Sequence, residues 1–337
     1  MTQREKKSAS KRDAVSGRIV VTGGLGFIGA HVFKHVARQK NADVRILDKV
    51  TYAADVRRIS DSGLDTEKVL MRGDILDPRD ASRALEGADT VIHLAGETHE
   101  PRFFDYPERF FEANAAGTET LVQAALDQGV KHFVHISTSA VYGSGPETDP
   151  VSELASLRPV TPYAHSKALA EEAVMLAAQN GLRATILRPG PVIGIGQNPE
   201  KPLPRMLIRA MQGRCLPIEG SGQQERSFLP VGDLVAAIDL VMARAPNDAL
   251  SVFNVAGSEQ LSPLDLARLV FEVTGRQTGL EFVHVRQPEA SPHRIHDGRI
   301  RSLGYRQKGT VRAELQAVCD DFRSRTRGLP LRFRLGV

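Results

Sequence analysis

The chain has 337 residues, of which 41% are hydrophobic and 25% charged, values typical of a soluble globular protein long enough for two coupled lobes. The formal net charge is +4, and residues 1–18 supply all of it, because they hold six Lys/Arg and two Asp/Glu (6 − 2 = +4). The rest of the chain is nearly neutral, which argues against a surface that binds nucleic acid or membranes. No apolar run is long enough to span a bilayer.

Residues 1–17 are predicted to be a disordered basic tail, because they offer almost no apolar side chains to bury. No apolar signal-peptide region follows them. Cys215 and Cys319 lie far apart and form neither a metal-binding nor a redox spacing. We therefore expect no metal site and a cytoplasmic location.

From residue 18 to about residue 190, apolar strands alternate with amphipathic helices. Helices are predicted at 27–40, 78–88, 113–129 and 162–181. The predicted strands are 18–23, 43–49, 69–75, 89–96, 131–138 and 182–190. This alternation predicts an α/β fold with a Rossmann-type, doubly wound parallel sheet that helices cover on both faces.

After Pro189 the composition changes, and residues 189–204 are too rich in Pro and Gly for regular structure. Shorter elements follow, with Ser262 predicted to cap a helix that ends near Gly275. We expect a smaller C-terminal α/β substrate lobe, with a crevice between the lobes at the carboxyl ends of the parallel strands. The cofactor lobe is predicted to comprise 18–189 with roughly 229–256, and the substrate lobe 190–228 and 257–337.

Three glycines, Gly23, Gly26 and Gly29, lie where the first strand passes into the first helix. In this context one glycine allows the tight turn, one lets a pyrophosphate approach the backbone, and one lets the helix pack on the sheet. Asp48 closes the second strand, where a carboxylate accepts hydrogen bonds from ribose hydroxyls and repels a 2′-phosphate. The pattern predicts an NAD site rather than an NADP site.

Two further stretches fit a bound dinucleotide. Asp74 follows the third strand, where it can reach the adenine, and the fourth strand ends in the small residues Ala95 and Gly96. Neighbours of these positions are also predicted to bind the cofactor, namely Phe27, Ile28, Lys49, Ile75 and Leu94.

Tyr163 and Lys167 lie four residues apart at the start of a predicted helix and therefore share one helical face. A lysine ammonium near a phenol favours the phenolate, so the tyrosine can act as a base near neutral pH. The preceding strand ends in the hydroxyl residues Ser137, Thr138 and Ser139, one of which can bridge a substrate hydroxyl and the tyrosine.

With these motifs the chain resembles an extended short-chain dehydrogenase/reductase of the nucleotide-sugar epimerase/dehydratase group, over about residues 18–320. The resemblance implies NAD as cofactor and a UDP- or dTDP-sugar as substrate. It also implies catalytic roles for Thr138, Tyr163 and Lys167. Tyr163 and Lys167 are expected to contact the cofactor too, with Lys167 at the nicotinamide ribose. Proteins of this kind form homodimers through two long helices, which here correspond to 110–128 and 163–179.

Several stretches are similar to the 4,6-dehydratases of this group, including LDKVTYAAD at 47–55 and the segment from Asn198 to Leu234. The resemblance implies that Glu200 and Lys201 lie near the substrate and that Arg226 holds its phosphates, a task suited to a planar, always-charged donor. The remaining residues that we expect at the substrate are Thr98, Ser139 and Arg294.

One departure from the 4,6-dehydratases bears on the reaction. Those enzymes carry Thr-Asp-Glu where this chain has Thr138, Ser139 and Ala140, and an alanine can neither take nor give the protons that dehydration requires. The stretch STSAVYG instead is similar to the 4-epimerases. We expect an NAD-dependent 4-epimerase of a UDP- or dTDP-hexose or uronate that works through a transient 4-keto sugar.

Three alternatives remain open. The first is an NAD(P)H-dependent 4-ketoreductase of a 4-keto-6-deoxy sugar. The second is a dehydratase or decarboxylase whose acid/base group has moved, for instance to Glu97. The third is a non-catalytic dinucleotide-sensing protein built on the same fold.

Overall fold

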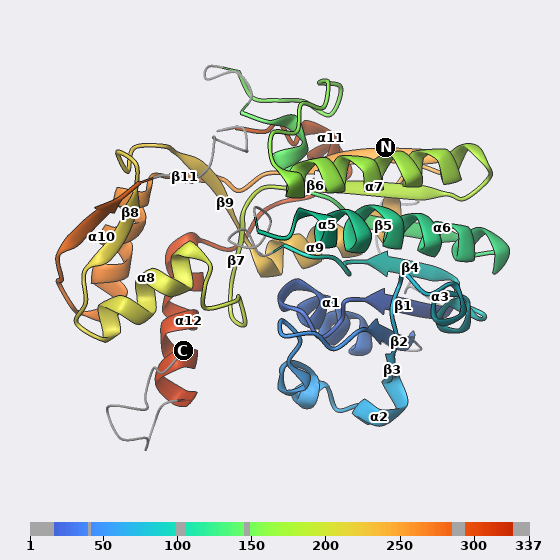
Figure 1. Ribbon diagram of the computed structural model, residues 1–337, viewed down its shortest axis with the longest axis horizontal. Coiled ribbons are helices and arrows are strands. Elements are labelled where there is room, and N and C mark those ends of the chain that lie inside the picture. Colours follow the sequence, from blue (N-terminus) through green and yellow to red (C-terminus); the bar gives the residue numbers. More distant parts are fainter. Residues whose placement is uncertain (1–16, 40–41, 99–104, 145–148, 285–293, 326–337) are drawn as a thin grey trace, which may run out of the picture.

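The computed structural model describes residues 17–39, 42–98, 105–144, 149–284 and 294–325 (Figure 1). A seven-stranded sheet has the order β10-β6-β5-β4-β1-β2-β3, and every neighbouring pair is parallel. Its strands are β1 Gly17–Thr22, β2 Ala42–Asp48, β3 Leu70–Arg72, β4 Thr90–His93, β5 His132–Ile136, β6 Ala184–Pro189 and β10 Leu250–Val255. The predicted doubly wound α/β sheet is confirmed.

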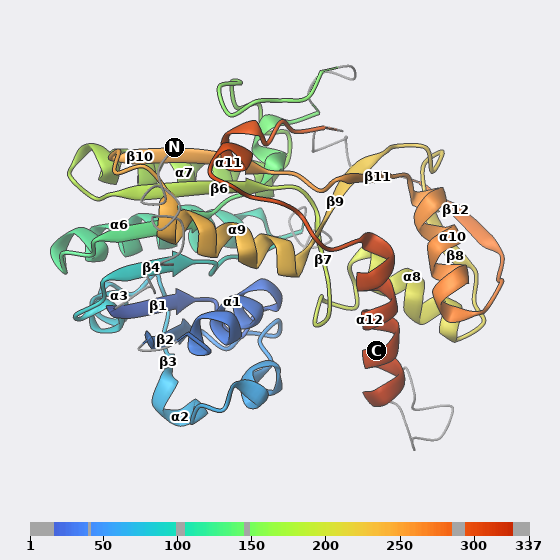
Figure 2. The ribbon, with the colours of Figure 1, turned by 180° about the vertical axis from the view of Figure 1, so that it is seen from behind.

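Helices cover both faces of this sheet, because its strands carry apolar side chains on both sides. The helices α1 (Phe27–Ala37) and α9 (Val231–Arg244) pack on one face (Figure 2). The helices α3 (Pro78–Leu85), α6 (Gly117–Asp127) and α7 (Pro162–Gln179) pack on the other. Short elements complete this part, namely η2 Val56–Ser62, α2 Thr66–Val69, α5 Pro107–Phe110, the π-helical turn η3 Phe111–Ala116, and η4 Ser139–Tyr142.

A second apolar cluster draws its buried residues from positions 193–319. Around it lie a three-stranded sheet, ordered β11-β9-β7, and the two-stranded β12-β8. The strands are β7 Val192–Ile193, β8 Leu216–Glu219, β9 Arg226–Pro230, β11 Glu259–Leu261 and β12 Leu280–Val283. The helices are α8 Pro202–Met211, α10 Pro263–Thr274 and α12 Val311–Arg325, while α11 Gly298–Ser302 lies against β10.

Three expectations need correction. Residues 189–204 are not wholly irregular, because β7 pairs with β9 within that stretch and Pro202 occupies the first turn of α8. The helix expected at 113–129 is divided into η3 and α6. Gly17 already belongs to β1, and the rest of the expected tail lies outside the described residues. No helix in the described ranges is both long and apolar enough to span a membrane.

Candidate active site

The glycine turn after β1 is a close-packed backbone cradle. Gly23 has φ +68°, and a Cβ there would lie 2.8 Å from the Cα of Ala95 at the end of β4. A Cβ on Gly29 would overlap the carbonyl of Gly23, whose oxygen accepts the N–H of Gly26 at 3.1 Å. The turn therefore requires glycine at 23 and 29, as the sequence pattern indicates.

Replacing Gly23 with alanine should weaken dinucleotide binding, because the new methyl group pushes the turn away from the segment after β4. Gly63 is a matched control, since it has φ +78° and a Cβ added there would meet no atom within 4 Å. Both substitutions cost about 1–2 kcal/mol of left-handed backbone strain, but only Gly23→Ala adds the collision. We expect NAD affinity, measured by isothermal titration, to fall at least about tenfold in Gly23→Ala and to stay unchanged in Gly63→Ala. Equal affinities in the two variants would contradict this account.

Asp48 ends β2 beside this turn and is 8% exposed. Its Oδ2 accepts the N–H of Leu25 at 2.9 Å, and its Oδ1 accepts the N–H of Val50 at 2.8 Å. Each carboxylate oxygen keeps a second lone pair for a ribose hydroxyl. Val50 has φ +58°, a strained conformation for a β-branched residue, and its bond to Asp48 helps to hold it there.

The other cofactor candidates line the carboxyl edge of the sheet. Lys49 and Asp74 form an ion pair with Nζ and Oδ2 2.5 Å apart, and Asp74 Oδ1 also accepts the N–H of Leu76. Leu94 and Ala95 both donate their N–H groups to Thr22 Oγ1 at 3.2 Å. The remaining candidates are Phe27 and Ile28, half-buried in the first turn of α1, Ile75, buried against Gly117, and the exposed Gly96.

Tyr163 and Lys167 both lie at the start of α7. Thr161 caps this helix by accepting the N–H of Ala164, and Pro162 occupies its first turn. Tyr163 is half-buried, whereas Lys167 is only 7% exposed. The Lys167 ammonium donates to the carbonyl of Ile136 at 2.7 Å, which fixes it beneath the end of β5. Burial lowers the pKa of Lys167 to about 8, although the negative charge of Glu171 acts to raise it. The ammonium form therefore persists at neutral pH.

Of the three hydroxyl residues after β5, Thr138 is the most exposed. Ser137 and Ser139 are buried, and Ser137 donates its hydroxyl proton to Glu171 Oε1. Thr138 is half-buried and accepts the N–H of Ala140 at 3.2 Å, which caps η4. Its hydroxyl proton remains available as a donor, so the geometry favours Thr138 for contact with a substrate.

Asn114 is a site residue that sequence reasoning missed. It lies in the π-helical turn η3, and its Oδ1 accepts the N–H of Glu97 at 2.7 Å. Its Nδ2 donates to the carbonyl of Glu97 and to Ser166 Oγ, which in turn donates to the carbonyl of Tyr163. Asn114 thus ties the loop after β4 to the first turn of α7. No pattern in the sequence marks a π-helical turn, although such turns are frequent at functional sites.

Beneath these residues lie two buried, neutral histidines. The Thr118 hydroxyl donates its proton to the carbonyl of Asn114, so it accepts a hydrogen bond from His93 Nε2. His93 is therefore protonated at Nε2, and its Nδ1 accepts from the Thr22 hydroxyl. Burial lowers the pKa of His93 to about 3. Burial and the nearby Lys167 also hold the pKa of His135 well below its ordinary value.

These histidines predict that the fold loses stability in mild acid. Burial also lowers the pKa of His132 to about 4, so between about pH 6.5 and pH 4 the unfolded chain takes up protons at His93, His132 and His135 that the folded chain refuses. Each contributes a fall of about 1.4 kcal/mol per pH unit in the free energy of unfolding. The free energy of unfolding, measured in urea at pH 7, 6 and 5, should therefore fall, and it should fall more between pH 6 and 5 than between pH 7 and 6.

Two matched variants test this pH dependence of the free energy of unfolding. His132→Gln should make it weaker, whereas His165→Gln, which changes an exposed histidine, should leave it unchanged. A free energy of unfolding that does not change between pH 7 and pH 5 would be incompatible with neutral, buried imidazoles.

A buried ion pair supports the segment from Ser137 to Tyr142. Arg188, at the end of β6, binds Glu171 of α7 through two nitrogens, with Nη2 and Oε2 2.6 Å apart. Neither side chain is more than 3% exposed. Arg188 also donates to the hydroxyl of Tyr142, which donates to Asn254 in β10. The hydrogen bonds join η4, α7, β6 and β10 into one network below the catalytic candidates.

The predicted substrate residues lie on two surfaces. Lys201, before α8, donates to the carbonyl of Thr98 at 2.8 Å and so reaches the loop after β4, while Glu200 beside it is exposed. Arg294 donates to Gln260, which pairs with Ser227 in the β11-β9 register, next to Arg226. Directly opposed residues share a face of the sheet, so Gln260 and Ser227 lie on one face and Arg226, opposite Leu261, points to the other. No group of three or more His, Cys, Asp or Glu side chains gathers in the described ranges in a way that can hold a metal ion.

Comparison with known proteins places the fold in a family. A model of the NAD dependent epimerase/dehydratase family matches residues 19–256. The chain is 30% identical over 311 residues to the trifunctional UDP-glucose 4,6-dehydratase/UDP-4-keto-6-deoxy-D-glucose 3,5-epimerase/UDP-4-keto-L-rhamnose-reductase of Arabidopsis thaliana. That match covers 90% of this chain and 46% of the plant protein, so the chain spans about half the length of this relative.

Solved structures of two different activities resemble the chain equally well. The dTDP-glucose 4,6-dehydratase DesIV of Streptomyces venezuelae, solved with NAD and TYD, has a TM-score of 0.84 at 30% identity, covering 91% of this chain and 97% of that one. The UDP-glucuronic acid 4-epimerase of Bacillus cereus, solved with UDP-glucuronic acid and NAD, also has a TM-score of 0.84, at 26% identity, covering 90% and 98%. The family match extends over more than half of the chain, and the chain therefore belongs to the NAD-dependent epimerase/dehydratase family.

Proposed function

We propose that this protein is a nucleotide-sugar 4-epimerase that oxidises C4 of a UDP- or dTDP-hexose or uronate and returns the hydride to the opposite face. The observation that carries the choice of reaction is the set of side chains at residues 137–142. They offer three aliphatic hydroxyls and the phenol of Tyr142, and no carboxylate. Dehydration needs an acid and a base near C5 and C6, whereas C4 epimerisation needs only the base that serves C4.

The residues present fit NAD as the resident cofactor. A Cβ at Gly23 or Gly29 would fill the space of the turn, and Asp48 keeps free lone pairs beside it. We assign residues 18–189 and 229–256 to holding this cofactor, and 190–228 and 257–337 to holding the nucleotide sugar. When bound, NAD supplies the hydride acceptor and donor.

In this proposal Tyr163 carries the proton transfer. Its phenolate oxygen takes the proton of the C4 hydroxyl as the C4 hydride departs, which leaves a 4-keto sugar, and it returns the proton when the hydride comes back. Lys167 favours the phenolate through its positive charge, which Ile136 holds in place. Thr138 donates a hydrogen bond that orients the reacting oxygen.

We also propose that Arg226 in β9 binds the diphosphate, for which a planar, always-charged guanidinium group is suited, and that Arg294 contacts the substrate elsewhere. Lys201 and Thr98 would border the sugar. A homodimer through α6 and α7 accords with the exposed leucines of α7, since Leu169 is 44% and Leu176 60% exposed and they lie seven residues apart. A sedimentation-velocity mass of a single chain would count against the dimer.

The experiment that tests the function has two parts. The purified protein is denatured, and the supernatant is assayed for released NAD. Separately, the native protein is incubated without added cofactor with UDP-glucose, UDP-glucuronate and dTDP-glucose, and the products are separated by chromatography. We expect bound NAD and inversion at C4 of one substrate. Absence of both would reject the proposal.

A second candidate is a 4,6-dehydratase, which the named activity of DesIV and a carboxylate beside the site favour. Glu97 follows β4, and Asn114 links its backbone to the turn that carries Tyr163. The same incubation separates the two, because a dehydratase gives a product lighter by one water. Consumption of added NADH or NADPH with a 4-keto sugar would instead indicate a reductase.

A further inference from the structure

Tyr52 and Glu97 join two loops that flank the glycine turn. The Tyr52 hydroxyl donates to Glu97 Oε1 at 2.6 Å. Tyr52 lies four residues beyond the end of β2, and Glu97 four residues beyond the end of β4. In the sheet order β4-β1-β2, these strands are the two neighbours of β1. The hydrogen bond therefore crosses the carboxyl end of β1, where the chain turns through Gly23.

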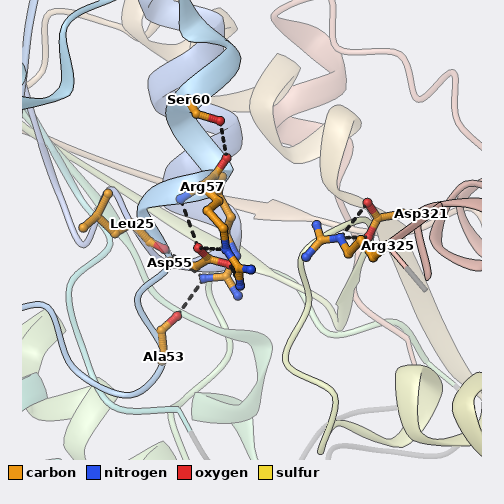
Figure 3. A network of polar contacts seen from close by, with 8 residues as sticks. Leu25, Ala53, Asp55, Arg57, Ser60, Asp321 and Arg325 are labelled. Atoms are coloured by element: carbon orange, nitrogen blue, oxygen red, sulfur yellow. Dashed lines mark hydrogen bonds and ion pairs between the residues drawn. The ribbon is translucent and has the colours of Figure 1, made fainter. Parts of the chain in front are cut away.

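The Tyr52 side of this crossing is anchored on the glycine turn. The carbonyl of Leu25 accepts the N–H of Asp55 at 3.1 Å and Nη1 of Arg58 at 2.8 Å, and Arg58 also donates to the carbonyl of Ala53. Figure 3 shows Leu25, Ala53 and Asp55 drawn together in this cluster. The loop that presents Tyr52 is thus fixed at its base, while the Tyr52 side chain is 48% exposed.

The Glu97 side is anchored independently. Asn114 binds both the N–H and the carbonyl of Glu97, and the N–H of Thr98 donates to Glu97 Oε1 at 3.1 Å. The carbonyl of Thr98 in turn accepts from Lys201, which precedes α8. The exposed, charge-assisted hydrogen bond between Tyr52 and Glu97 therefore joins two fixed supports on opposite sides of β1.

In open α/β sheets a dinucleotide lies outside the carboxyl ends of the strands, with its pyrophosphate at the glycine turn. We propose that the Tyr52–Glu97 hydrogen bond is a strap that retains NAD at this edge of the sheet between turnovers. A strap of this kind serves a reaction that recycles its cofactor, because each turnover returns the cofactor to its starting state. The inference concerns the family's cofactor and not the fate of the sugar, so it stands or fails separately from the proposed epimerase activity.

The test measures NAD release from the protein loaded with NAD, in the absence of sugar. The protein is diluted into a large excess of ADP-ribose, and freed NAD is converted to NADH by alcohol dehydrogenase and ethanol and followed by absorbance. We expect about tenfold faster release from Tyr52→Phe and from Glu97→Ala, the loss that one charge-assisted hydrogen bond predicts. The double variant should release NAD no faster than the single variants, since all three lack the same bond.

Tyr106→Phe is the matched control, because Tyr106, which precedes α5 at the far end of the connection that holds Glu97, is 47% exposed and packs its ring against Arg109. Its release rate should equal that of the unmodified protein. Unchanged or slower release from Tyr52→Phe would overturn the strap. Faster NAD release from Glu97→Ala alone would also overturn the strap, because the carboxylate would then retain NAD without the tyrosine.

Discussion

Replacing Tyr163 with phenylalanine is expected to lower kcat by about a hundred- to ten-thousandfold, the contribution typical of a positioned general base. Only the phenol oxygen is lost. The helix keeps its Thr161 cap, and Lys167 keeps its bond to Ile136. The expected loss therefore falls on the chemical step rather than on folding. The measurement is the initial rate of product formation at saturating nucleotide sugar.

NAD content and the thermal unfolding midpoint of Tyr163→Phe serve as the control, and both should match those of the unmodified protein. A variant that lost NAD as well would point to a binding role for the phenol. A kcat within about threefold of the original would show that another group removes the proton, and the role given to Lys167 would fall with that of Tyr163.

The second large effect is expected from the buried pair of Glu171 and Arg188. Replacing Arg188 alone with methionine leaves an unpaired carboxylate at a position that is 0% exposed, and we expect the free energy of unfolding to fall by about 3–5 kcal/mol. The Tyr142 hydroxyl also loses the hydrogen bond that Arg188 donates to it. Glu171 keeps only the Ser137 hydroxyl among the side-chain donors of the described residues. Urea unfolding at pH 7, followed by circular dichroism, measures the change.

The double variant Glu171→Met with Arg188→Met is the informative comparison. Two apolar side chains of suitable size leave no buried charge, so much of the lost stability should return. If the double variant were as unstable as the sum of the single variants, the pair would contribute through packing with its neighbours and not through the matching of two charges.

The glycine turn and the position of Tyr163 and Lys167 at the start of one helix were predictable because each is encoded locally. Spaced glycines, a closing Asp48 and a four-residue spacing are visible in short stretches of the chain. The alternation of apolar strands and amphipathic helices likewise predicts the parallel sheet, since the apolar pattern within each element shows which of its faces is buried. Lys167 was placed correctly on α7, but its partner, the carbonyl of Ile136, depends on how α7 packs on β5.

The parts that sequence reasoning missed all join distant segments. Asn114 links the loop after β4 to α7, and Tyr52 meets Glu97 from 45 residues away. The pairing of β7 with β9 gives regular structure to a stretch whose own composition opposes it. Such contacts are decided by the packing of whole elements, and a single sequence carries no local signal of them.

The most direct test of the central claim follows the hydrogen at C4. The protein is incubated with a nucleotide sugar deuterated at C4, without added cofactor, and the product is examined by NMR. Because the hydride that leaves C4 returns to C4 in an epimerase, we expect deuterium retained at an inverted C4. Deuterium found at C6 of a dehydrated product would contradict the account, because the hydride would then have been used to complete the loss of water.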